Sequence, residues 1–160
     1  MNNYNDRDTI QVNTSTNTKS SETISGDFSM LNLSADNYLA LITPIADTTT
    51  WKMIIVSYRG KAVEGNFSAD GILTDGKQQI QIRQVKVWED GKVPTFKPII
   101  GYEFFIDNKS IAAVQSSLDS FQKKFVWLRQ DLDESMKTIL AAASASLMVY
   151  TDDSMGKLAF

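Results

Sequence analysis

The stretch TILAAASASLMVYT, from Thr138 to Thr151, is strongly apolar, and its 14 residues carry no charge. Lys137 precedes it and Asp152 follows it. Such a run is typical of a membrane span, of a helix that binds a partner, or of a helix buried in a core. Fourteen helical residues rise about 21 Å, whereas the hydrocarbon core of a bilayer is about 30 Å thick. We therefore expect no transmembrane segment here.

The periodicity of this run predicts a helix from about residue 134 to about residue 150. Asp131 and Asp133 precede Glu134, which is typical of an aspartate N-cap followed by an acidic first turn. The apolar stripe consists of Met136, Ile139, Leu140, Ala143, Leu147 and Tyr150. The opposite side consists of Thr138, Ala141, Ala142, Ala145, Met148 and Val149, also without a charge. Because a helix that is apolar all round is buried or lies in lipid, we expect a core helix buried on every side.

Short segments typical of β-strands precede the helix, with turn residues between them. They are FSMLNL (28–33), YLALIT (38–43), WKMIIVSY (51–58), KAVEGNF (61–67), QQIQIRQVKVW (78–88), IIGYEFFI (99–106), SIAAVQ (110–115) and KKFVWLRQ (123–130). The turns RGK and DNK predict two hairpins, the first joining 51–58 to 61–67 and the second joining 99–106 to 110–115. The sequences DGIL (70–73) and TDGK (74–77) indicate a connection between the predicted strands at 61–67 and 78–88. The spacing from Ile82 to Val85 predicts a β-bulge or a change of buried face near Arg83 and Gln84.

Many strands followed by one helix, without helical crossovers, predict an α+β fold. We expect a mostly antiparallel curved sheet or barrel wrapped around the buried C-terminal helix. The length of 160 residues fits one domain. Residues 1–25 include 14 Asn, Thr or Ser residues, too polar a composition to offset the entropy of ordering. We therefore expect a flexible tail over 1–26, a domain over 27–155 and a C-terminal tail over 156–160.

The chain contains no cysteine and no histidine. This composition excludes disulfides, cysteine-ligated zinc or iron–sulfur centres, and serine or cysteine mechanisms that use imidazole as the base. No glycine-rich phosphate loop and no EF-hand spacing occur. We therefore expect a protein that is not an enzyme, with no catalytic residues, no metal and no cofactor.

The net charge of −3 is mild and argues against a surface built for nucleic-acid phosphates. The first residues lack the basic and apolar regions of a secretory signal. We therefore expect a cytoplasmic protein that does not bind nucleic acid.

The loop KVWEDGKVPTFKP (86–98) is the candidate binding site. It combines aromatic and lysine side chains, which suit a peptide or an anionic head group. The predicted binding residues are Trp88, Lys92, Phe96 and Lys97. The alternative is that Trp88 and Phe96 close the end of the barrel, because large aromatic side chains usually pack.

The sequences GYEFFIDNKSIAAVQ (101–115) and FVWLRQDLDESMKTILAAASASLMVY (125–150) together resemble the tubby-like superfamily, which includes LURP-one-related and phospholipid-scramblase-like proteins. In that superfamily a small apolar strand run leads through an acidic stretch into a core helix, and residues 111–114 and 131–134 match these two parts. The resemblance implies a barrel around the helix. A full tubby-like barrel has more strands than we place here. The basic cluster with which tubby proteins bind phosphoinositides is also missing, so that activity is not carried over.

These observations predict a non-enzymatic binding or interaction domain, similar to tubby-like proteins, whose partner is a protein or an amphipathic ligand. One alternative is a small acidic immunity-type or inhibitor-type protein that neutralises a protein partner. Another is a lipid-associated or membrane-associated scramblase-like module. Pull-down and liposome binding distinguish these hypotheses.

Overall fold

The structure, a computed structural model, describes residues 10–19, 34–44, 49–59, 67–87, 91, 100–115 and 124–156. This part of the chain forms eight strands and one helix. The strands are β1 (Ile10–Lys19), β2 (Ser34–Pro44), β3 (Trp51–Arg59), β4 (Phe67–Thr74), β5 (Gln79–Val85), β6 (Gly101–Ile106), β7 (Lys109–Gln115) and β8 (Phe125–Leu128), and the helix is α1 (Glu134–Gly156). The predicted strand at 28–33 lies outside the described residues, as does most of the predicted strand at 61–67.

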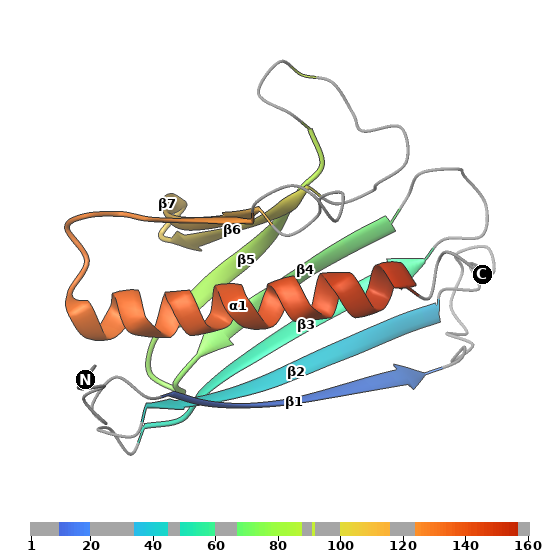
Figure 1. The fold of residues 1–160 in the computed structure, drawn as a ribbon, viewed down its shortest axis with the longest axis horizontal. Helices are drawn as coiled ribbons and strands as arrows, with labels where there is room; N and C mark the ends of the chain where they lie inside the picture. The colour runs from blue at the N-terminus through green and yellow to red at the C-terminus, as the bar shows by residue number, and fades with distance from the viewer. Residues whose placement is uncertain are drawn as a thin grey trace, which may run out of the picture.

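The eight strands form one sheet in which each strand pairs antiparallel with the next along the chain. The sheet curls into a half-barrel, and α1 packs against its concave face (Figure 1). The helix contacts both ends of the sheet, β1 and β2 on one side and β7 and β8 on the other. The predicted α+β class, with a curved antiparallel sheet and a C-terminal helix, is confirmed.

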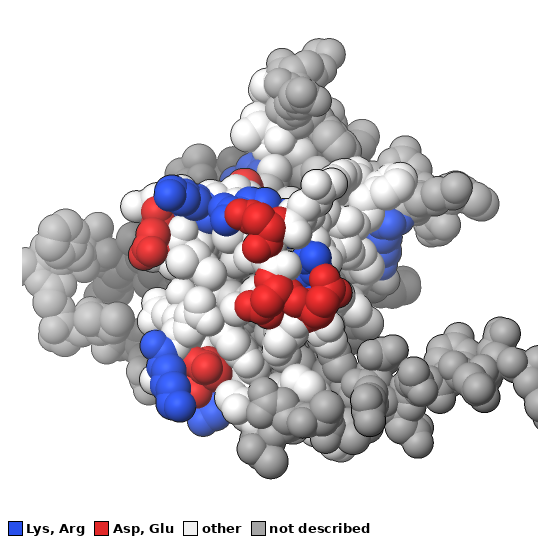
Figure 2. Space-filling view, turned by 90° about the vertical axis from the view of Figure 1, so that its left-hand side faces the viewer, with Lys and Arg blue, Asp and Glu red and all other residues white. Residues whose placement is uncertain are grey.

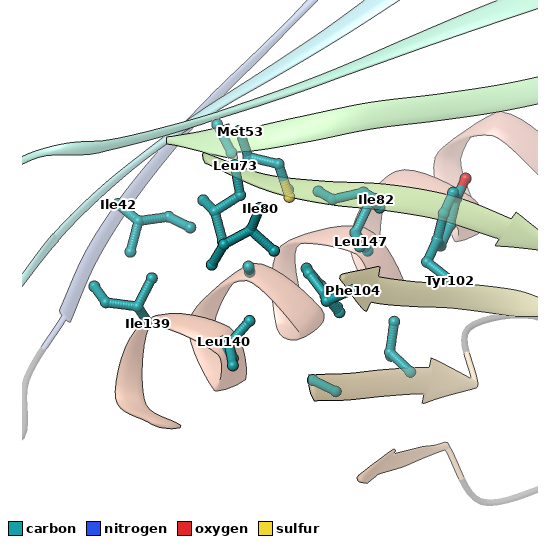
Figure 3. Close-up of a cluster of buried hydrophobic side chains, with 14 of the residues drawn as sticks. Ile42, Met53, Leu73, Ile80, Ile82, Tyr102, Phe104, Ile139, Leu140 and Leu147 are labelled. Atoms are coloured by element: carbon teal, nitrogen blue, oxygen red, sulfur yellow. The ribbon is translucent and has the colours of Figure 1, made fainter. Parts of the chain in front are cut away.

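The core lies between the concave face of the sheet and one side of α1 (Figure 3). Side chains on alternate strand residues point into it, as the fully buried Ile80 and Ile82 of β5 do between exposed neighbours. Tyr102 and Phe104 point inward from β6, while Glu103 points outward and is half-buried, as its alternation predicts. Each fully buried aliphatic side chain contributes about 1.5–3 kcal/mol through the hydrophobic effect. This core therefore holds α1 against the sheet.

The predicted hairpin that joins 99–106 to 110–115 is confirmed and consists of β6 and β7. Its two turn residues, Asp107 and Asn108, have φ angles of 49° and 61°, as a type I′ turn requires. The register shifts in this hairpin, next to Phe104 and Phe105. Of the two alternatives predicted near Arg83 and Gln84, the β-bulge is wrong for the pairing with β6, which has no register shift there. The change of buried face stays a prediction, because Gln84 and Val85 are both half-buried.

Strand β4 corrects the prediction for residues 67–74. The sequence Asp70-Gly71 was interpreted as part of a connection, but both residues lie within β4, which pairs with β3. A Cβ atom at Gly71 would overlap the carbonyl oxygen of Ile54. The glycine therefore permits close approach of two strands rather than a turn. The turn that follows instead centres on Gly76, whose φ is 91°.

The N-terminal segment also differs from its prediction. Residues 10–19 form β1, so the flexible tail predicted over 1–26 is wrong for these ten residues. All ten pair with β2 in continuous register. This pairing supplies the strand with backbone hydrogen bonds, although its side chains at 11–15 are exposed. An edge strand of this kind needs little apolar burial of its own, because its stability comes from the neighbouring strand.

The helix begins as predicted and differs in two other respects. Asp133 caps it, because its Oδ1 accepts a hydrogen bond of 2.7 Å from the backbone N–H of Met136. The helix extends to Gly156, beyond the predicted end near residue 150 and one residue into the predicted C-terminal tail. The prediction of burial on every side is wrong, because Ala141, Ala145 and Val149 are exposed.

Candidate functional site

The exposed stripe of α1 is the first wall of the candidate site. Ala141, Ala145 and Val149 are four residues apart, so they lie above one another on one side of the helix. Val149 is 56% exposed, although it is aliphatic. Thr138 and Ala142 border the stripe and are half-buried. Among the described residues, no strand covers this apolar side of the helix, and a ligand can contact it.

Strand β1 provides the second wall. Val12 pairs with Ile42, and Thr14 pairs with Ala40. Ile42 and Ala40 are fully buried on the concave face, and paired residues project to the same face of a sheet. Val12 and Thr14 therefore project toward the helix side of the sheet, where Val12 is 37% exposed.

A groove of about 680 Å³ lies between these two walls. Among the residues that the structure describes, its lining consists of Val12, Thr14, Thr138, Ala141, Ala142, Ala145, Ser146 and Val149. None of these side chains is charged, and three of them are alanine. Small side chains leave room above the helix backbone, so the groove can accept apolar groups but offers no partner for a charge.

Two of the hydroxyl groups in the lining are already hydrogen-bonded within the protein. The Thr138 hydroxyl donates to the carbonyl oxygen of Glu134 at 2.7 Å. The Ser146 hydroxyl lies 2.5 Å from the hydroxyl of Tyr38, which also donates to the carbonyl oxygen of Ser146 at 3.1 Å. These bonds make the groove less polar than its composition indicates.

The same tyrosine fixes α1 to β2 beneath the groove. The ring of Tyr38 stacks on the ring of Tyr150 with centroids 4.6 Å apart. A serine hydroxyl within a helix can bond the carbonyl four residues back, but the Ser146 hydroxyl pairs with Tyr38 instead. The Ser144 hydroxyl is buried without a hydrogen-bond partner among the described residues. The groove therefore rests on a floor that is held by side chains from both elements.

The predicted binding residues Trp88, Lys92, Phe96 and Lys97 lie outside the described residues. The groove is formed by residues that the sequence did not single out as a site. Val12 was assigned to a flexible tail, and the alanines of α1 were expected in the core. The signal that could have revealed β1 is its alternation of β-branched residues, Ile10, Val12, Thr14, Thr16 and Thr18.

The outward face of the sheet carries a polar hollow of about 410 Å³. The guanidinium carbon of Arg83 lies 4.6 Å from the ring centre of Phe105. Arg83 also donates hydrogen bonds to Gln81 and Asn108 at 2.8 and 3.0 Å. Because the guanidinium group already makes these contacts within the sheet, the hollow is a weaker candidate for a ligand site than the groove.

Strand β8 exposes a pair of aromatic rings. Phe125 and Trp127 are 48% and 53% exposed, and their ring centres are 5.8 Å apart. Trp127 pairs with Ala113, which in turn pairs with Glu103 in β6, so Trp127 lies on the same outward face as Glu103. This pair is exposed apolar surface on a strand of only four residues.

Two carboxyl groups have a lowered pKa for local structural reasons. The pKa of Asp131 is lowered by its hydrogen bonds from Arg129, at 2.5 and 2.8 Å. The pKa of Asp75 is lowered by backbone N–H groups of Gln78 and Lys77, at 2.7 and 2.8 Å. Both carboxylates are solvated, and their partners belong to turns rather than to a cleft. These shifts therefore do not indicate a catalytic pair.

Charged residues on the end of the molecule that faces the viewer in Figure 2 are of both signs. Acidic and basic side chains are interspersed there among the described residues. The described part of the chain contains no group of three acidic, histidine or cysteine residues that could hold a metal ion. Within the same residues, no helix is long and apolar enough to cross a membrane.

Comparison with protein-family models, with curated proteins and with solved structures finds no match. The resemblance to the tubby-like superfamily therefore stays a prediction. The candidate site rests on the geometry of this chain alone.

Proposed function

We propose that this chain is a non-enzymatic binding domain and that the groove between β1 and α1 holds the apolar part of its ligand. The observation that carries this proposal is a groove of about 680 Å³ in which none of the described lining residues is charged. A volume of this size is typical of a ligand site.

The exposed stripe of α1 supports the same proposal energetically. Burial of apolar surface contributes about 25 cal/mol per Å², so a ligand that covers Val149 and the neighbouring alanines gains affinity by removing them from water. The stripe contains no lysine, glutamate or aspartate, which are the usual residues on the solvent side of a helix. A helix side of this composition fits a covered surface better than a permanently solvated one.

The ligand class is a protein segment or an amphipathic molecule with an uncharged apolar part. A charged group in the groove would lose its hydration without finding a counter-ion in the lining. A small acidic protein that neutralises a partner is one form of this proposal. A scramblase-like module that binds lipid surfaces is the alternative, and binding to phosphatidylcholine vesicles tests it.

The experiment uses the neutral fluorescent probe N-phenyl-1-naphthylamine, titrated with the full chain. We expect saturable binding to the wild-type protein and at least a tenfold loss of affinity in Ala145→Glu, because the new carboxylate would be desolvated by the probe. The control is Gln79→Glu, which adds the same charge at an exposed, outward position of β5. We expect this control to bind like the wild type.

Two results would overturn the proposal. One is the absence of binding to the wild-type protein at millimolar concentration. The other is equal affinity in Ala145→Glu and wild type, which would place the probe elsewhere. Circular dichroism checks that both variants keep their fold, which we expect because Ala145 and Gln79 are exposed.

A further inference from the structure

Strand β1 is an edge strand of the sheet. All ten of its residues pair with β2, from Ile10 opposite Pro44 to Lys19 opposite Ala35, without a register shift. Among the described strands, β2 is its only neighbour. Because backbone groups of alternate residues point to opposite edges of an antiparallel strand, every second residue of β1 directs its N–H and C=O away from β2.

This edge lacks the features that usually prevent pairing with another chain. Proteins protect edge strands by short length, charges, proline or bulges. Strand β1 has ten residues, a single charge at its last position, Lys19, and no proline. The opposite edge, β8, has four residues. The long and regular edge is therefore the one that borders the groove.

A strand added to β1 would lie over the groove. Neighbouring strands are about 4.8 Å apart, and alternate side chains point to the same face. The inward side chains of an added strand would continue the row of Val12 and Thr14 and cover the exposed stripe of Ala141, Ala145 and Val149. The two alanines leave room for aliphatic side chains from above.

We propose that an extended segment of a partner protein adds to β1 as a ninth strand and places alternate apolar, uncharged side chains in the groove. This inference rests on the proposed function of the groove and specifies its ligand. The eleven residue steps from Thr138 to Val149 correspond to about 17 Å of helix. An extended chain covers this length with about five residues, of which two or three point inward.

The uncharged described lining and the edge of β1, with which no other described strand pairs, together favour this occupant. Main-chain hydrogen bonds give affinity in strand addition, and side-chain pockets give specificity. A second copy of β1 is a poorer occupant, because its sequence is polar from Asn13 to Lys19 and supplies aliphatic side chains only at Ile10 and Val12.

The experiment uses a capped, fluorescein-labelled peptide of nine residues in which valine alternates with serine and lysine. Binding to the full chain is measured by fluorescence anisotropy up to millimolar protein. A peptide of the same composition with its valines in adjacent pairs is the control. We expect the alternating peptide to bind at least tenfold more tightly than the control, and Ala145→Glu to lose this binding while Gln79→Glu retains it.

Two N-methylated versions of the alternating peptide test the backbone hydrogen bonds. One is methylated at its valines and the other at the residues between them. Because only one of these sets can direct its N–H groups toward β1, we expect one version to lose at least tenfold in affinity and the other less than threefold. Equal affinities of the two versions would overturn strand addition.

The remaining outcomes separate this inference from the proposed function. If the naphthylamine probe binds in the groove but no peptide does, strand addition is wrong and the binding groove stands. If neither binds, both proposals fail. Sedimentation equilibrium tests whether a second copy of this chain binds at the edge of β1. A dimer that is dissociated by Thr14→Pro would show that this edge serves self-association, and it would overturn the proposed partner protein.

Discussion

Two alanines on opposite sides of one turn of α1 provide a direct test of how the helix is buried. Ala143 is fully buried in the core, whereas Ala145, two residues later, is exposed in the groove. Replacing each with aspartate introduces the same side chain into the same helix. Both variants carry the same loss of helix propensity, at most about 0.7 kcal/mol. Any larger difference between their stabilities therefore reports burial.

The expected magnitudes follow from the surroundings of each position. Ala143 lies in a cluster of hydrophobic residues, and a buried carboxyl group there would have its pKa raised by about 3–5 units. At 1.36 kcal/mol per unit over the roughly three units between the unfolded pKa of about 3.9 and pH 7, Ala143→Asp would lower the free energy of unfolding by about 4 kcal/mol at pH 7. This is a large fraction of the stability of a typical domain, about 5–15 kcal/mol. Ala145→Asp would lower it by about 0.5–1 kcal/mol.

Urea unfolding followed by far-ultraviolet circular dichroism measures both variants against the wild type. The pH dependence provides a second measurement. The carboxyl group of Ala143→Asp has a folded pKa above its unfolded value of about 3.9. The part of its penalty that comes from ionisation is therefore absent below about pH 4 and increases up to the folded pKa. We expect the stability difference between the two variants to shrink as the pH falls from 7 to 4.

Equal destabilisation of the two variants would refute this reasoning. A fully unfolded Ala145→Asp would show that α1 is buried on every side and that the groove is closed. An Ala143→Asp variant as stable as the wild type would show that the helix does not pack on the sheet through this face. Either result would also remove the basis of the proposed binding site.

Three further perturbations test the parts of the fold that support the groove. Tyr38→Phe should cost about 1–3 kcal/mol because it leaves the Ser146 hydroxyl buried without its partner, and adding Ser146→Ala should recover part of this loss in a double-mutant cycle. Asp75→Asn should flatten the acid side of the stability profile in urea titrations between pH 2 and 6. The lowered pKa of Asp75 means that its stabilising contribution is present above about pH 4 and is lost as the pH falls through the folded pKa. Gly101→Ala should lower the thermal midpoint, at a cost of about 1–3 kcal/mol, because its Cβ would overlap the carbonyl oxygen of Val114; an unchanged midpoint would contradict the close approach.

The elements that the sequence predicted correctly are specified by local chemistry. Asp107 and Asn108 tolerate positive φ angles, so they identify the hairpin of β6 and β7 without any tertiary information. Asp133 identifies the start of α1 because its side chain bonds the first turn of its own helix. The order of strands before a single helix was enough to predict the fold class.

The elements that were missed depend on distant partners. Gly71 occurs in a sequence typical of a turn, but its role is set by the approach of β3. Strand β1 is polar and forms because β2 offers it a complete backbone ladder. An alanine suits a buried and an exposed helix side equally, so Ala143 and Ala145 could not be distinguished before the position of the sheet was known. The groove was unpredictable because both of its walls belong to this second group.

The strand order has a consequence for how the chain acquires its structure. Each strand pairs with the strand before it, so the sheet can grow by successive hairpins as the chain leaves the ribosome, with little loop entropy to overcome at each step. The helix is the last described element, yet it contacts both the first strands and the last strands. The concave face of the sheet therefore remains uncovered during synthesis until α1 emerges. Throughout that interval the growing chain exposes an apolar surface, on which a chaperone can act.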